Sequence, residues 1–122
     1  MVLVDTSVWI DHFRAKGSHL IDLLGAGRVS MHDHVLGELA LGSLKNREGT
    51  LDDLANLPRA LSATEEEVRS FIGSRQLFAC GIGYTDAHLL ASVVLNGVTE
   101  LWTTDTRLAT VADELGVAYR LT

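Results

Sequence analysis

The chain opens with an apolar run that ends abruptly in an acid. Val2, Leu3 and Val4 are followed by Asp5 and then by two hydroxyl residues. A short, wholly apolar run is typical of a strand buried on both faces, and such strands belong mainly to parallel sheets covered by helices. In these sheets ligands bind beyond the carboxyl ends of the strands. Asp5 is therefore expected at a ligand-binding edge.

Segments with strand and helix patterns alternate along the rest of the chain. Strands are expected at residues 28–32, 100–105 and 117–121, with a rudimentary one near Leu61. Thr64 and Glu67 form a capping box that opens a helix over residues 64–76, and a second helix over 86–95 is apolar nearly all round. This alternation predicts an α/β fold, a three-layer α/β/α sandwich around a central parallel sheet. Residues 1–122 are expected to form one domain.

Cysteine content and hydropathy predict the compartment. The lone Cys80 excludes an intramolecular disulfide, fits a reducing compartment and is expected to be a buried, inert thiol. No apolar run approaches the roughly 18 residues of a membrane span, and the N-terminus lacks the basic segment of a signal peptide. We therefore expect a cytoplasmic protein without a membrane partner.

Asp5 and Asp105 occupy equivalent positions, each at the junction between a predicted strand and a following helix. If the two strands are neighbours, the acids start from backbones about 4.8 Å apart, close enough to hold one cation. The alternative is that each acid only caps its helix, because Asp is among the preferred N-cap residues.

Two further acids lie in unusual sequence surroundings. Glu38 has Val35 and Leu41 three residues away on its predicted helix, and unpaired acids avoid apolar surroundings. Asp86 lies in the first turn of the most apolar helix, where the helix dipole also favours a carboxylate. One oxygen-rich site built by Asp5, Glu38, Asp86 and Asp105 explains all four acids together. Such a site suits Mg²⁺ or Mn²⁺. His34, one helical turn before Glu38, leaves a zinc site open as an alternative.

With these acids assembled, the sequence resembles the PIN-domain ribonucleases and, within them, the VapC-type toxins of bacterial toxin–antitoxin pairs. The matching segments are residues 4–11 (VDTSVWID), the helix with Glu38, residues 85–91 (TDAHLLA) and residues 101–105 (LWTTD). Any one segment alone is weak evidence. The ordered set spans the whole chain.

The resemblance implies a parallel sheet of strand order 3-2-1-4-5, with the strands that carry Asp5 and Asp105 adjacent. It implies Mg²⁺-dependent hydrolysis of RNA, in which Asp5, Glu38, Asp86 and Asp105 are catalytic and bind the metal. Thr6, Ser7 and Thr104 are candidates for hydrogen bonds that fix the acids, with helix capping as the alternative. Many relatives have a second acid and an aromatic residue shortly after the last aspartate, where this chain has Thr106, Arg107 and Leu108. The resemblance therefore implies either one or two metal ions.

The resemblance also implies a homodimer and a cognate VapB-type antitoxin whose tail occupies the acidic groove, with an arginine reaching the carboxylates. A net charge of −6 at first argues against RNA as a partner. If four of the sixteen acids share a metal site, however, twelve remain to face ten bases. The candidates for contact with the RNA backbone are Arg14, Lys16, Lys45, Arg47 and Arg107. The alternative for each of them is an ordinary solvated charge.

Two other functions fit part of the pattern. A phosphatase or phosphotransferase would use Asp5 itself as the nucleophile, but such enzymes place a second acid two residues on, where this chain has Ser7, and require a buried lysine. The second is a catalytically inactive module that binds RNA or an antitoxin.

Overall fold

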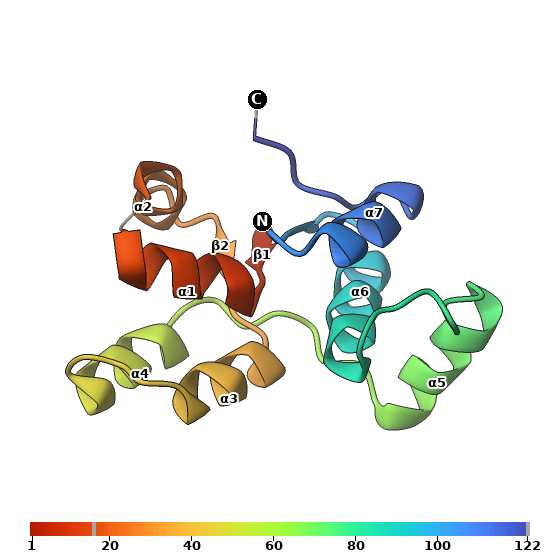
Figure 1. Ribbon diagram of the computed structural model, residues 1–122, viewed down its shortest axis with the longest axis horizontal. Helices are drawn as coiled ribbons and strands as arrows, with labels where there is room; N and C mark the ends of the chain where they lie inside the picture. Colours follow the sequence, from red (N-terminus) through yellow and green to blue (C-terminus); the bar gives the residue numbers. More distant parts are fainter. Residues whose placement is uncertain (16, 122) are drawn as a thin grey trace.

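The computed structural model describes residues 1–15 and 17–121, and in this part of the chain helices and short strands alternate. The elements in chain order are β1 (Val2–Val4), α1 (Thr6–Ala15), α2 (Ser18–Gly25), β2 (Val29–Ser30), α3 (Asp33–Leu41), α4 (Arg47–Ala55), α5 (Glu65–Ser74), α6 (Tyr84–Asn96), β3 (Glu100–Trp102) and α7 (Thr106–Glu114). Figure 1 shows the short strands at the centre, with helices around them.

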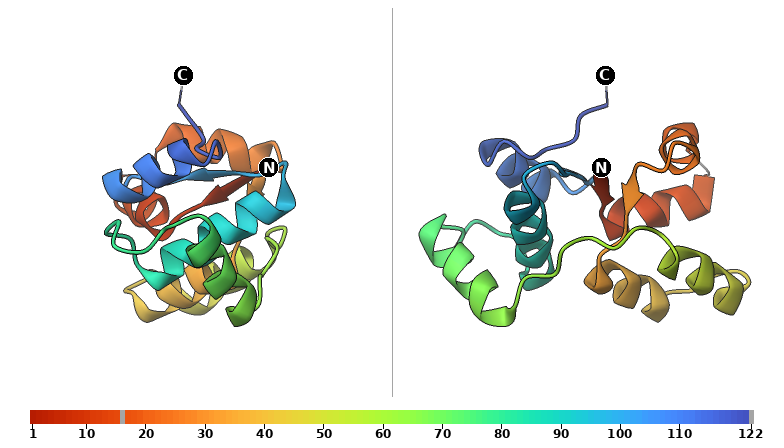
Figure 2. Two further views of the ribbon diagram at one scale, coloured as in Figure 1. Left: turned by 90° about the vertical axis from the view of Figure 1, so that its right-hand side faces the viewer. Right: turned by 180° about the vertical axis from the view of Figure 1, so that it is seen from behind.

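The sheet is parallel and has the order β2-β1-β3. β1 is central, and its three side chains are 0% exposed. Helices lie on both faces of the sheet, with α2 and α7 on one side and α6 on the other (Figure 2). The predicted α/β class with a central parallel sheet is therefore confirmed.

The two outer strands of the expected order 3-2-1-4-5 are reduced to single parallel bridges. Met31 pairs with Arg59 beyond β2, and Leu101 pairs with Ala118 beyond β3. The bridges lie where the outer strands were expected, so the order of the chain segments fits. A full strand over 117–121 is not formed, because the backbone bonds there end at Tyr119 N, which donates to the carbonyl of Leu101 at 2.8 Å.

Helix α6 is the central helix of the core. Its residues from Ala87 to Val93 are all buried, as its apolar pattern predicts. The predicted capping box before α5 is also present, with Thr64 and Glu67 bonded reciprocally. The strongest local patterns therefore correspond to elements of the fold.

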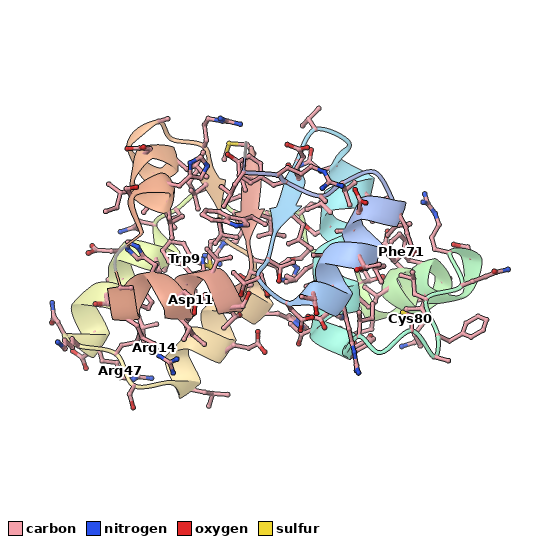
Figure 3. All side chains as sticks on the ribbon, turned by 45° about the horizontal axis from the view of Figure 1, so that its top comes forward. Trp9, Asp11, Arg14, Arg47, Phe71 and Cys80 are labelled. Carbon is pink, nitrogen blue, oxygen red and sulfur yellow. The ribbon has the colours of Figure 1, made fainter. Side chains whose placement is uncertain are left out.

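Cys80 corrects one expectation, because it is exposed and not buried. It lies in the connection between α5 and α6, at the α5 side of the molecule (Figure 3). Gln76 and Ala79 have φ values of 56° and 61°, so the backbone turns sharply through this connection. These turns leave the Cys80 side chain on the surface, although its thiol donates to the carbonyl of Leu77 at 2.8 Å.

Within the described ranges, no helix is long and apolar enough to cross a membrane.

Candidate active site

The site lies at the carboxyl ends of β1 and β3, which pair in parallel with Val4 opposite Trp102. The amide of Asp5 continues this ladder by donating to the carbonyl of Trp102 at 2.9 Å. Residues 103–105 leave the sheet at the same edge. The end of the first strand and the end of the third therefore supply side chains to one place.

Asp5 is 6% exposed and is held by two hydroxyls. Ser7 and Thr103 both donate to its Oδ2, each at 2.7 Å. The amide of Thr104 in turn donates to Ser7 Oγ at 3.1 Å. These bonds, which link α1 to the segment after β3, offset part of the cost of burying the carboxylate.

Glu38 joins the site from α3. Thr6 Oγ1, in the first turn of α1, donates to Glu38 Oε1 at 2.7 Å. The expectation that apolar residues enclose Glu38 is wrong, because Glu38 is exposed and Leu41 is 90% exposed. Of these two apolar neighbours of Glu38, only Val35 lies in the core, where it is 0% exposed. Glu38 thus faces solvent at the rim of the site.

Asp86 and Asp105 cap helices while belonging to the same region. Asp105 Oδ1 accepts from the amides of Arg107 and Leu108, at 2.9 and 3.2 Å, and so begins α7. Asp86 Oδ2 accepts from the amide of Gly83 at 2.9 Å and reaches back to the start of α6. The capping role proposed as the alternative for Asp105 therefore exists, and Asp86 also caps its own helix, but each role uses only one carboxylate oxygen.

The four carboxylates share one pattern of hydrogen bonding. In each, one oxygen accepts the bonds given above, and within the described part of the chain the other oxygen accepts none. Burial raises the pKa of Asp86, and the negative charges of Asp5, Asp105 and Glu38 raise it further. Asp86 is thus close enough to the other three acids to be repelled by them. Free carboxylate oxygens in mutual repulsion fit a hard divalent cation.

The free oxygens do not yet form a closed cage. Among the described residues, no three of these acids bring ligand oxygens within 4.8 Å of one another. Like-charged carboxylates repel when no cation lies between them. Mg²⁺ also keeps several of its waters and commonly needs only one or two direct carboxylates, so this wider spacing suits it.

The structure separates the three hydroxyl residues that the sequence singled out. Thr6 and Ser7 donate to Glu38 and Asp5, as described above. The hydroxyl of Thr104, by contrast, has no hydrogen bond within the described ranges; only its backbone amide takes part. Sequence reasoning missed Thr103, which donates to Asp5 and accepts from the amide of Asp105 at 3.0 Å. Its position directly after β3 was the available signal.

The five basic candidates for RNA contact are dispersed. Arg14 and Lys45 line a pocket of about 700 Å³ that also reaches Glu38. Arg47 lies at the same end of the molecule as Arg14 (Figure 3) and donates to the carbonyl of Ala40 at 2.9 Å. Arg107 packs beside the α5–α6 connection, where a side chain added to Gly81 would touch it. Lys16 lies outside the described residues.

His34 does not pair with Glu38 in a metal-binding group. Its partners in such a group are His88 and Glu65, from two other helices. His34 was expected as a partner of Glu38 if the site held zinc. His88 is 2% exposed.

Comparison with known proteins identifies the family of the chain. The family model described as "PIN domain" matches residues 2–114. A curated relative, Ribonuclease VapC32 of Mycobacterium tuberculosis, is 49% identical over 118 residues, which cover 97% of this chain and 95% of the relative; the sequences from strains CDC 1551 / Oshkosh and H37Rv match equally. Among solved structures, PAE2754 from Pyrobaculum aerophilum superposes with a TM-score of 0.56 over 94% of each chain, at 17% identity. That last likeness shows a shared fold.

Proposed function

The chain belongs to the PIN-domain family and is a VapC-type member of it, and on this premise we propose that it is a Mg²⁺-dependent endoribonuclease toxin. Asp5, Glu38, Asp86 and Asp105 are its catalytic and metal-binding residues. The observation that carries the proposal is the hydrogen bonding of these four carboxylates, each with one oxygen fixed by the protein and the other left free.

The protein contributes a pre-oriented set of negative oxygens. Ser7 and Thr103 hold Asp5 in one rotamer, and the backbone amides at the starts of α6 and α7 hold Asp86 and Asp105. Such outer hydrogen bonds fix the direction of the ligands and are worth about 10- to 100-fold in metal affinity or activity. Bound Mg²⁺ or Mn²⁺, as one or two ions, supplies a water of lowered pKa and neutralises charge on the phosphate. The protein itself holds and orients the carboxylates that bind the ion.

Ser7 is not arranged as a covalent nucleophile. Ser7 Oγ donates to Asp5 and accepts from the amide of Thr104, so it is fully engaged. The phosphotransferase alternative needs a buried lysine near Asp5. Lys45 is exposed, and no buried lysine occurs among the described residues. Direct hydrolysis by water is therefore the better-supported route.

The pocket beside Glu38 supports a partner that binds next to the acids. Ile10, Phe13, Leu39 and Leu44 give it apolar walls, and Glu38 contributes a charge. We assign it to the tail of a cognate VapB-type antitoxin, whose apolar side chains would fill the pocket while an arginine pairs with the carboxylates. A cation from the partner would then replace the metal. The active form is a homodimer in the cytoplasm, where RNA is available.

RNA would approach over the same acidic edge, with Arg14 and Lys45 nearest to Glu38. Incubation of the purified chain with RNA tests the activity directly. We expect cleavage with Mg²⁺ and none in excess chelator. Recovery of a stable phosphorylated Asp5 would instead support the phosphotransferase.

A further inference from the structure

A second group of metal-ligating side chains lies apart from the four acids. His34 comes from α3, Glu65 from the first residue of α5 and His88 from the second turn of α6. One ligand atom from each lies within 4.8 Å of the other two. The three residues are 31 and 23 positions apart along the sequence, so only the tertiary fold brings them together.

His88 is the buried member of this group. Its Nε2 is inaccessible to solvent and lies 3.0 Å from Glu65 Oε1, the distance of an ion pair, although the angle is poor for a hydrogen bond. The nitrogen therefore faces a carboxylate oxygen, and both atoms are potential ligands of one cation.

The other two members are held near this nitrogen. The rings of His34 and His88 lie 4.2 Å apart at an interplanar angle of 32°. Tyr84 donates its hydroxyl to Glu65 Oε2 at 2.6 Å, which leaves Oε1 facing His88. The side chain of Glu65 is 62% exposed, so it is free to close on an ion. In a tetrahedral site with bonds of 2.0–2.1 Å, ligand atoms lie about 3.4 Å apart, a small adjustment from the observed spacing.

We propose that His34, Glu65 and His88 form a zinc site with one coordination position left for water or another ligand. Two imidazoles and one carboxylate are a donor set that suits Zn²⁺, whereas Mg²⁺ prefers oxygen ligands alone. This site is distinct from the proposed nuclease site. It does not depend on the proposed function.

His88 and Asp86, two residues apart on α6, face different neighbours. Asp86 Oδ2 accepts from the amide of Gly83, whereas His88 Nε2 lies 3.0 Å from Glu65 Oε1.

A bound ion would connect three helices. α5 is joined to the rest of the fold mainly through α6, and Glu65 is its first residue. Zinc held by all three side chains would anchor the start of α5 to α3 and α6. Because a ligand that binds only the folded state stabilises it, zinc should raise the melting temperature.

The test is calorimetric titration of Zn²⁺ into the full chain without a polyhistidine tag, in excess Mg²⁺, with the absorption spectrum of the Co²⁺ form as a second readout. We expect one ion per chain and the absorption of tetrahedral Co²⁺. E65Q and H34Q should each weaken binding about tenfold or more. E66Q removes an equal charge from the adjacent exposed position and should bind as the parent does.

A double variant D5N/D105N should keep the zinc site, because it alters only the acids at the strand ends. Melting curves without metal establish that each variant is folded. Unchanged zinc affinity in E65Q and H34Q would overturn the proposal. So would zinc binding that disappears in D5N/D105N, since the ion would then belong to the four acids.

Discussion

Thr103 Oγ1 donates to Asp5 Oδ2 at 2.7 Å, although the two residues are 98 positions apart in the sequence. The bond exists because β1 and β3 are parallel neighbours, so the residues that follow Val4 and Trp102 emerge together. It ties the most buried acid of the site to the segment that carries Asp105.

This bond gives the first prediction. T103V keeps the shape of the side chain but removes the donor, so Asp5 should be less well oriented and RNA cleavage should fall about 10- to 100-fold. T104V is the matched control, because the hydroxyl of Thr104 makes no bond within the described ranges. The RNA-cleavage rates of both variants, measured at saturating Mg²⁺, test this prediction. Equal losses in the two would show that the Thr103 hydroxyl has no special role.

Removal of an acid should stabilise the metal-free protein. Burial and the three neighbouring acids raise the pKa of Asp86, so its ionised form is unfavourable in the folded state at neutral pH. D86N keeps an oxygen that can accept from Gly83 and should raise the melting temperature in chelator by a few degrees. The gain should shrink as pH falls, because protonated Asp86 no longer repels its neighbours.

Thermal melts at several pH values check this prediction, with the exposed α4 acid replaced in D53N as the control. A melting temperature that falls in D86N would mean that the capping bond to Gly83 outweighs the repulsion.

His32 should make the protein sensitive to acid. Burial, and then the charges of His34 and His88, lower the pKa of His32 from 6.5 to about 4. The unfolded chain therefore binds a proton that the folded chain rejects, and stability should decrease as pH falls from about 6.5 towards 4. The full effect is of the order of 3 kcal/mol.

H32N isolates this effect, because Asn is also a preferred N-cap and can accept from the amide of His34 as the imidazole does. Urea unfolding at pH 7 and pH 4.5 should show a smaller loss of stability in the variant than in the parent. An identical loss would assign the acid sensitivity to other groups.

The pocket beside Glu38 predicts a variant that escapes the antitoxin. F13A removes an apolar wall of the pocket and should weaken binding of the cognate antitoxin at least about tenfold while RNA cleavage persists. F78A is the control, since Phe78 is exposed at 65% and does not line this pocket. Antitoxin affinity that is unchanged in F13A would place the partner elsewhere. Phe13 stacks on Trp9, so a melting curve must accompany the measurement.

The sequence predicts well what depends on local pattern. The buried first strand and the apolar α6 follow from hydrophobic runs, and the start of α5 follows from its capping box. The placement of Asp5 beside the end of β3 required only the rule that parallel strands end at one edge. These features are encoded within a few residues of one another.

Other features depend on tertiary contacts that no local pattern encodes. Helical spacing suggested His34 as a partner of Glu38, yet the packing of three helices places it with His88 and Glu65. The same limit applies to Cys80, whose exposure follows from two residues with positive φ in an irregular connection. The two outer strands are likewise reduced to single bridges, of Arg59 with Met31 just beyond β2 and of Ala118 with Leu101 within β3.

The four acids are proposed to form a metal-dependent RNA-cleaving site. The most direct measurement is the cleavage rate of purified D5N on RNA in Mg²⁺, against the parent and against D11N, which changes an exposed acid of the same helix region. We predict that D5N loses cleavage by at least about 100-fold, the upper range for disturbed metal ligation, and that D11N retains it. Full activity in D5N would contradict the account.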